Sequence, residues 1–281
     1  MPSYVSHAIQ ASNVLDKVYK DKQVFIEPDR DAMKTFAMLY DSPHSIKDLN
    51  NHDQHAKDLI LKIAQIIKER KLFVDSEAIS LLYGHICHFA FDAKVHPYIN
   101  HLAARTKERK ISPVSNHLLM ELYLDEYLSK QLYKCDTLHL GCDFLGHANL
   151  HNPNIVDTVN DAYKTVYDHD KMIRYYRRFE CLINDANLLK KLTHKQLADL
   201  FLFKHFLDKN NISVERITNV YHNQWLDSSD SFMDLYHQSL TLSQELINLV
   251  NKFIFQGKSF TLISDKFPTI SIDTGQKIYT K

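Results

Sequence analysis

Glycine and proline are scarce in this chain of 281 residues, which contains five glycines and seven prolines. These residues mark tight turns and interrupt regular elements, so their scarcity argues against many short strands and favours long helices. No apolar run approaches the roughly 20 residues needed to cross a bilayer. The N-terminal residues also lack the apolar core of a signal peptide. We therefore expect no transmembrane segment and a cytoplasmic location.

Net charge and paired cysteines are lacking as well. The 34 basic and 34 acidic side chains cancel, which argues against a protein that binds polyanions through a general basic excess. The cysteines show neither a CxxC pair nor the spacing of a metal knuckle, so we expect free buried thiols in a reducing compartment. The four cysteines are Cys87, Cys135, Cys142 and Cys181.

A helical period of apolar residues runs through most of the chain, with steps of three and four residues. The segments that show it are 58–73, 76–92, 115–133, 155–183, 194–209 and 231–255. Residues 257–281 alternate instead, which predicts an extended tail or a short hairpin. We find no internal repeat and no low-complexity linker. The sequence therefore predicts one all-α, multi-helix domain that spans residues 1–281.

Histidine is abundant, with 17 in the chain, and four of them fall in the segment HICHFAFDAKVHPYINH, residues 85–101. His88, Asp92 and His96 follow one another at intervals of four residues. On a helix this spacing places the three side chains on one face. Because proline disfavours helical geometry in the residue before it, Pro97 predicts that the helix ends at His96.

Further histidines and carboxylates share this chemistry. His117 and Glu121 form a second pair four residues apart, Asp41 and His55 are fourteen residues apart, and His7 lies near the start of the chain. Imidazole and carboxylate groups are ligands that zinc accepts, and a pair spaced by four can reach one ion from one helix. A set with many members and no cysteine suggests open, catalytic coordination rather than a structural site.

The stretch YGHICHFAFDAKVHPYI (83–99) resembles the signature of the zinc-dependent phospholipase C family, which shares its fold with the single-strand-specific zinc nucleases. FAMLYD (36–41) resembles the family segment that ends in a ligating aspartate, and HLLME (117–121) resembles its HxxxE pair. QWLDSSDSFMDLY (224–236) is similar to a segment of uncharacterised bacterial members. The resemblance is specific over residues 1–125 and loose beyond them.

The resemblance implies two to three zinc ions. The implied ligands are Asp41, His55, His88 and Asp92 for one ion; His96, His117 and Glu121 for a second; and, for a third, His7, the bridging Asp92 and the α-amino group of Pro2 after removal of Met1. The context of the first aspartate departs from the family pattern. His44 is therefore an alternative to Asp41, and His52 to His55. His85 and His101 match no family ligand, and we expect them to be exposed or hydrogen-bonded.

The implied activity is that of a zinc-dependent phosphoric diester hydrolase, most similar to phospholipase C, in which metal-activated water cleaves a phosphate ester. Asp92 is the bridging catalytic carboxylate, and Asp41 is our candidate for the general base. Phospholipid or another phosphodiester is the expected substrate. Single-stranded nucleic acid is less favoured because the chain has no net charge.

Two other functions compete with this one. The His-Asp dipeptides at 52–53 and 169–170 are typical of HD-type phosphohydrolases, which are helical and use other divalent metals. This alternative leaves the spaced histidine and carboxylate sets without a role. The chain is alternatively a non-catalytic helical scaffold that binds zinc for stability or for docking a partner.

Overall fold

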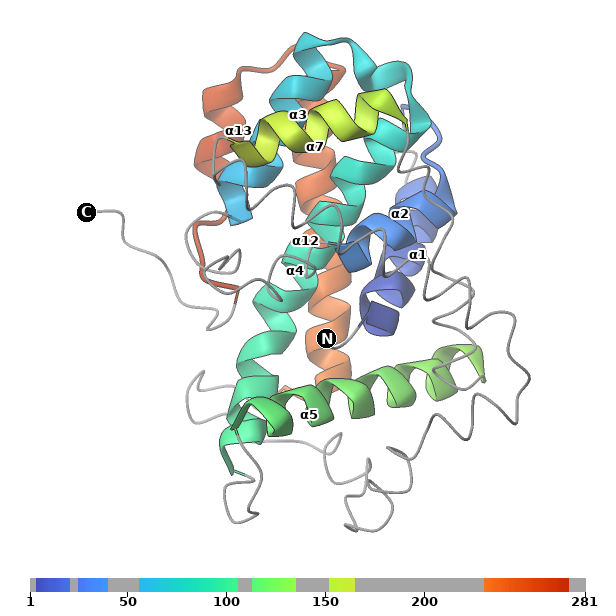
Figure 1. Ribbon diagram of the computed structural model, residues 1–281, viewed down its shortest axis with the longest axis vertical. Helices are drawn as coiled ribbons and strands as arrows, with labels where there is room; N and C mark the ends of the chain where they lie inside the picture. Colours follow the sequence, from blue (N-terminus) through green and yellow to red (C-terminus); the bar gives the residue numbers. More distant parts are fainter. Residues whose placement is uncertain are drawn as a thin grey trace.

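All regular structure in the described residues is helical. The computed structural model describes residues 4–20, 25–39, 56–105, 113–134, 152–164 and 230–272 (Figure 1). Its helices are α1 (Tyr4–Lys20), α2 (Arg30–Leu39), α3 (Ala56–Glu69), α4 (Ser76–Arg105), α5 (Pro113–Leu128), α7 (Pro153–Lys164), α12 (Phe232–Ile254) and α13 (Phe260–Lys266), with a short 3-10 helix η2 (Leu72–Val74) and a short π-helix η4 (Ser129–Tyr133). These ranges contain no strand, which confirms the all-α prediction for them.

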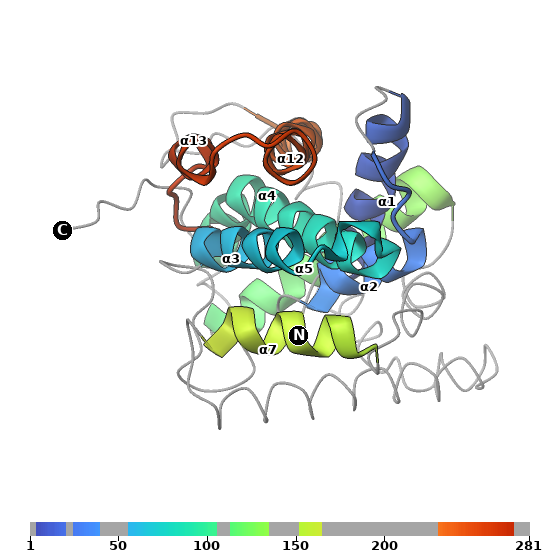
Figure 2. The same ribbon diagram turned by 90° about the horizontal axis from the view of Figure 1, so that it is seen from above.

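Helix α4 is the centre of the arrangement. It packs against α1, α2, α3, α5, α7 and α12, and Figure 2 shows α12 and α7 on opposite sides of it. Tyr83, Phe89, Phe91 and Tyr98 are all buried although they point in different directions around the helix. Apolar residues on every side are typical of a helix enclosed by others. Polar side chains of α4 therefore face neighbouring helices rather than solvent.

Helix α4 continues through Pro97, so the prediction that it ends at His96 is wrong. A proline inside a helix costs about 3 kcal/mol, because it lacks an N–H and crowds the preceding turn. The residues after Pro97 offset this cost by burial. Tyr98 and Ile99 are completely buried, and the helix continues to Arg105. His96 therefore sits inside the helix rather than at its end.

Glycine is required where α2 crosses α4. A Cβ atom on Gly84 would lie 2.7 Å from Phe36 Cβ and 2.8 Å from both Ala37 N and Met33 O. These distances are far below normal contact, and two of the three atoms belong to the backbone of α2. Gly84 therefore brings the α2 backbone against α4 one helical turn before His88.

The prediction of an extended tail over residues 257–281 is wrong for its first part, which forms α13. Ser259 caps the first turn of this helix by accepting a hydrogen bond at its side-chain oxygen. Ile263 and Phe267, four residues apart, are both buried and hold one face of the helix on the core. The end of the tail, beyond residue 272, lies outside the described residues.

The other predicted helices agree with the structure where it can be compared. The predicted segments 58–73, 76–92, 115–133 and 231–255 correspond to α3, α4, α5 with η4, and α12. Helix α7 covers the beginning of the predicted segment 155–183. The remainder of that segment and the whole of the segment 194–209 lie outside the described residues. Cys87 is free and buried, and the other cysteines also lie outside. None of the described helices is long and apolar enough to cross a membrane.

Candidate metal centre

The structure gathers six of the nine predicted metal ligands into two neighbouring groups. In each group, the three residues offer ligand atoms that all lie within 4.8 Å of one another. The first group is His7, His88 and Asp92, and the second group is His96, His117 and Glu121. The remaining predicted ligands, and the alternatives offered for two of them, lie outside the described residues. These are Pro2, Asp41, His55, His44 and His52.

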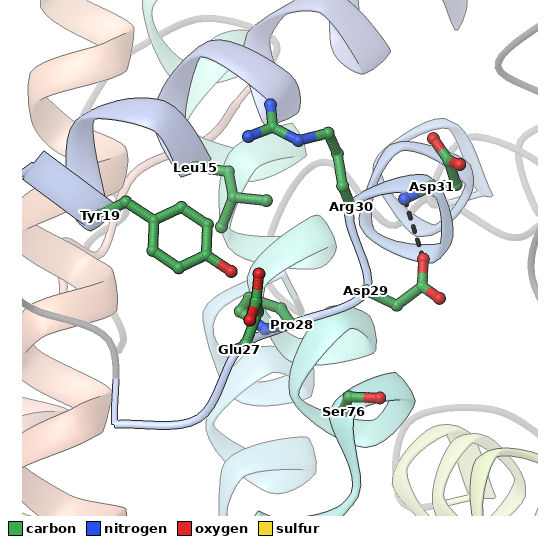
Figure 3. Close-up of a pocket in the computed structure, with 8 residues that line it drawn as sticks. All are labelled: Leu15, Tyr19, Glu27, Pro28, Asp29, Arg30, Asp31 and Ser76. Atoms are coloured by element: carbon green, nitrogen blue, oxygen red, sulfur yellow. Dashed lines mark hydrogen bonds between the residues drawn. The ribbon is translucent and has the colours of Figure 1, made fainter.

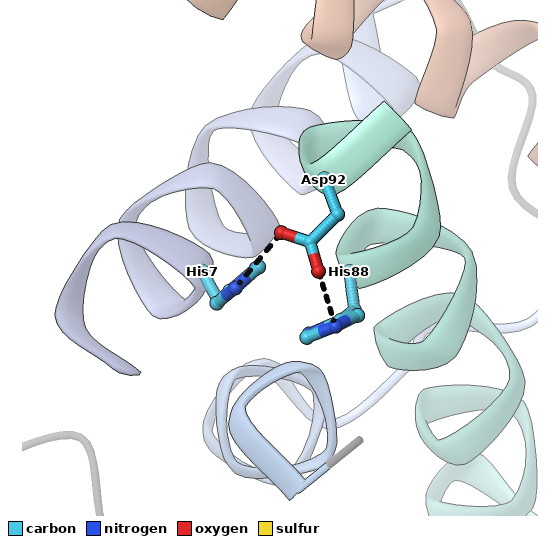
Figure 4. A group of neighbouring side chains, drawn as sticks. All are labelled: His7, His88 and Asp92. Carbon is cyan, nitrogen blue, oxygen red and sulfur yellow. Dashed lines mark ion pairs between the residues drawn. The ribbon is translucent and has the colours of Figure 1, made fainter. Parts of the chain in front are cut away.

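The first group joins α1 to α4. His7 comes from α1, while His88 and Asp92 occupy successive turns of α4, and the carboxylate directs one oxygen toward each ring (Figure 4). Asp92 Oδ1 is 3.3 Å from His7 Nε2, and Asp92 Oδ2 is 2.8 Å from His88 Nε2. The two imidazole rings stack with their centroids 4.0 Å apart. All three side chains are completely buried.

The second group joins α4 to α5. Glu121 Oε1 is 3.3 Å from His96 Nε2 and 2.8 Å from His117 Nε2. His117 and Glu121 are one turn apart on α5, as their spacing predicts. His96 and Glu121 are nearly buried, whereas the side chain of His117 is 22% exposed. The second group is therefore the one that reaches solvent.

Asp92 links the two groups. Its Oδ1 atom is 3.3 Å from His7 Nε2 and 3.6 Å from His96 Nε2, so one carboxylate oxygen faces a histidine of each group. Asp92 and His96 are on successive turns of α4, which explains why the two groups are adjacent. This position between the groups suits a bridging carboxylate.

Hydrogen bonds at the far side of two rings fix which nitrogen carries the proton. His88 Nδ1 lies 2.9 Å from the carbonyl oxygen of Ala37, and His117 Nδ1 lies 2.9 Å from Asn100 Oδ1. A backbone carbonyl oxygen only accepts, so in His88 Nδ1–H is the donor; in His117 the same assignment follows from Asn100 presenting its Oδ1 rather than its NH2 group to the ring. In a neutral imidazole, Nε2 then presents a lone pair, and in both rings that lone pair faces a carboxylate oxygen at 2.8 Å.

Two facing lone pairs need a positive charge between them. A proton on Nε2 supplies one at a single pair, but protonating both His7 and His88 would place two positive rings in a 4.0 Å stack. A metal ion satisfies several pairs at once. Ligands about 2.0–2.1 Å from zinc stand roughly 2.9 to 3.4 Å apart, depending on the coordination angle. In each group the 3.3 Å contact falls in that range, and the 2.8 Å contact lies just below it.

Both carboxylates are held in their ionised form. Burial alone would raise the pKa of Asp92, but the positive charge available on His88, His96 and His7 outweighs it and lowers that pKa. For Glu121, burial likewise raises the pKa, but the hydrogen bonds and positive charge that His117 and His96 supply when protonated together outweigh it and lower the pKa. A cation in either group acts in the same direction. The centre thus combines two buried negative charges with four imidazoles, which is a donor set suited to a divalent ion.

His85, on the same helix, shows what a structural histidine looks like. Its Nδ1 bonds the carbonyl oxygen of Leu81 at 2.9 Å, and its Nε2 lies 3.3 Å from the hydroxyl of Tyr163, which can donate. Burial lowers the pKa of His85 to about 3, so the ring is neutral. Both nitrogens are satisfied without an ion, as expected for a hydrogen-bonded histidine. His101 is also buried and belongs to neither group.

A cavity of about 430 Å³ lies elsewhere, between the end of α1 and the start of α2 (Figure 3). None of the six clustered ligands lines it. Its polar residues already serve the fold: Asp29 caps α2 by accepting hydrogen bonds from the backbone N–H groups of Asp31 and Ala32. Arg30 donates to Asp16 and to Ser12. The cavity therefore offers no convergent set of reactive groups.

Sequence reasoning missed the groups that orient the ligands. Every residue has a backbone carbonyl, so nothing in the sequence singles out that of Ala37. Asn100 did carry a signal, because it follows His96 by four residues and so continues the same face of α4. Comparison of the chain with protein-family models, curated proteins and solved structures finds no match. The geometry of the two groups is therefore the basis on which a function is proposed.

Proposed function

We propose that this chain is a zinc-dependent phosphoric diester hydrolase, most similar in its ligand pattern to phospholipase C. The observation that carries the proposal is the state of the ring nitrogens. In each group, a carbonyl or amide oxygen accepts a hydrogen bond from Nδ1–H of one histidine, and the Nε2 atom of that ring faces an ionised, buried carboxylate at 2.8 Å. Metal-binding histidines are commonly oriented in this way.

The donor set favours zinc. Four imidazoles and two carboxylates, without cysteine, are typical of zinc sites that keep a position open for a reactant. The carbonyl of Ala37 and the amide of Asn100 hold two of the rings in place, which pre-organises the ligands. Asp92 holds the two groups together. Two adjacent ions held by these residues would supply the chemistry that activates water at neutral pH and neutralises the charge of a phosphodiester.

Substrate would approach from the side of the second group. His117 is the most exposed of the six ligands, and the first group is closed to solvent. An ion in the first group would thus add positive charge on the side away from the substrate, and an ion in the second group would contact the phosphate. Phospholipid or another phosphodiester remains the proposed substrate class, and single-stranded nucleic acid is the less favoured one.

Metal content and turnover test the proposal together. We would purify the chain without an affinity histidine tag, measure bound metals by elemental analysis, and assay hydrolysis of bis-p-nitrophenyl phosphate. We expect about two to three zinc ions per chain. The Asp92→Asn variant removes the shared charge and should lose both zinc and turnover. Asp161→Asn is the control, because Asp161 is a partly exposed carboxylate that pairs with Arg70 on the surface.

The outcomes separate the proposed hydrolase from its rivals. Wild-type protein that binds no zinc, even when zinc is offered back, would refute the proposal. Bound zinc without turnover of any phosphodiester would favour the scaffold, which the complete burial of His7, His88 and Asp92 also favours. Iron or manganese in place of zinc would favour an HD-type enzyme.

A further inference from the structure

A third buried carboxylate, Asp125, lies beside the metal centre without belonging to either group. Its Oδ1 atom accepts a hydrogen bond of 2.8 Å from the backbone N–H of Ser6 and another from the Ser6 hydroxyl. Asp125 is 3% exposed and follows Glu121 by one turn of α5. Ser6 directly precedes His7 in the first turn of α1. One side chain therefore joins the neighbourhoods of both groups.

The contact between Asp125 and Ser6 closes a triangle of helices. The first group ties α1 to α4, and the second group ties α4 to α5. Asp125 supplies the third side by tying α5 back to α1. The backbone N–H groups of a first helical turn have no acceptor within their own helix. In α1, that acceptor comes from a residue 119 positions away.

We propose that Asp125 is a positioning residue that holds the first turn of α1, and with it His7, in register with the ligands on α4 and α5. This inference rests on the proposed metal-dependent function. If the first turn of α1 shifts, His7 Nε2 moves away from Asp92 while the second group stays intact. Loss of Asp125 should then weaken zinc binding at the first group and leave the second group unchanged. Residues that orient ligands typically change metal affinity by 10–100-fold.

The test isolates each group in the full-length chain. The Glu121→Gln variant disrupts the second group and leaves the first intact. The His7→Ala variant disrupts the first group and leaves the second intact. Zinc affinity is measured by competition with a chromophoric chelator, with and without Asp125→Ala. We expect Asp125→Ala to weaken binding roughly 10–100-fold in the first background and less than about threefold in the second. A purely structural defect would weaken both.

Two milder variants keep the test decisive if Asp125→Ala folds poorly. Asp125→Asn retains an oxygen that accepts from the Ser6 N–H, so it should restore most of the first group's affinity. Ser6→Ala keeps the backbone bond and loses only the hydroxyl donor, so it should show a smaller loss at the same group. Ser231→Ala is the matched control, because it removes a helix cap from α12, which carries no ligand.

The possible failures are distinguishable. If the wild-type chain binds no zinc, the proposed function is refuted, and the positioning inference falls with it. If the wild-type chain binds zinc and Asp125→Ala leaves the first group's affinity unchanged, the positioning inference alone is overturned. Equal weakening of both groups would also overturn it, because Asp125 would then support general stability.

Discussion

The close crossing of α2 over α4 should be essential for metal binding, and Gly84→Ala tests it directly. A methyl group at this position would meet Phe36 Cβ at 2.7 Å and two backbone atoms of α2, Ala37 N and Met33 O, at 2.8 Å. The backbone atoms cannot rotate away as the end of a side chain can. Helix α2 must therefore move outward as a unit, and the carbonyl of Ala37 moves with it.

The size of the effect follows from these distances. Apolar contacts are most favourable near 3.5–4.0 Å, so α2 has to retreat by roughly 0.7–1 Å. Overpacking of this kind costs roughly 1–3 kcal/mol. The higher helix propensity of alanine relative to glycine offsets about 1 kcal/mol of this overpacking cost. The same movement stretches the 2.9 Å bond between His88 Nδ1 and Ala37 O to more than about 3.5 Å, which is no longer a hydrogen bond.

Two assays separate the stability effect from the metal effect. We expect urea unfolding in the presence of a chelator to show Gly84→Ala destabilised by up to about 2 kcal/mol. Zinc competition should show affinity reduced about 10–100-fold, because His88 loses its orienting partner. Gly257→Ala is the control: Gly257 has a φ of 69° with nothing within 4 Å of the added Cβ. That variant should lose about 1–2 kcal/mol of stability and no zinc affinity. Wild-type zinc affinity in Gly84→Ala would refute the reasoning.

Three further predictions concern the ion, a structural histidine and a helix cap. Chelation should lower the unfolding free energy by about 4 kcal/mol relative to zinc at 1,000 times its Kd, as differential scanning calorimetry would show. His85 stays neutral in the fold and gains a proton on unfolding, so stability falls as pH drops from 6.5 toward 3. His85→Gln should make that slope shallower by up to about 1.4 kcal/mol per pH unit in urea titrations, and an unchanged slope would contradict it. Ser231→Ala removes a capping box with Asp234 and should cost about 1 kcal/mol of unfolding free energy without altering zinc binding.

Long helices were predictable because many residues report one period. The segment 231–255 differs from α12 by one residue at each end. Helix α13 was missed because it has only seven residues, too few to distinguish a helical period from alternation. At Pro97 the sequence predicted a helix end that does not occur. The local preference of proline against helix was overcome by burial of the residues that follow it.

For the candidate site, the contacts within one helix were predictable from the sequence, and the contacts between helices were not. Pairs on one helix, such as His88 with Asp92 and His117 with Glu121, follow from a spacing of four. The contacts between helices do not. Nothing in the sequence indicates that His7 stacks on His88, because that contact depends on how α1 packs against α4. The likeness to phospholipase C placed these residues in one centre and stays a prediction.

The sequence does not show which atom lies opposite each nitrogen of a histidine ring, and burial does not separate His85 from His88 either. His85 and His88 are both completely buried on α4, and each donates a hydrogen bond from Nδ1–H to a backbone carbonyl oxygen. The difference is the atom opposite Nε2. For His85 it is the hydroxyl of Tyr163, which brings its own proton, and for His88 it is a carboxylate oxygen of Asp92, which brings none. Only the second arrangement brings a ring nitrogen against a carboxylate, which favours an added positive charge. The same arrangement recurs at His117, and a divalent ion at both places is what we propose.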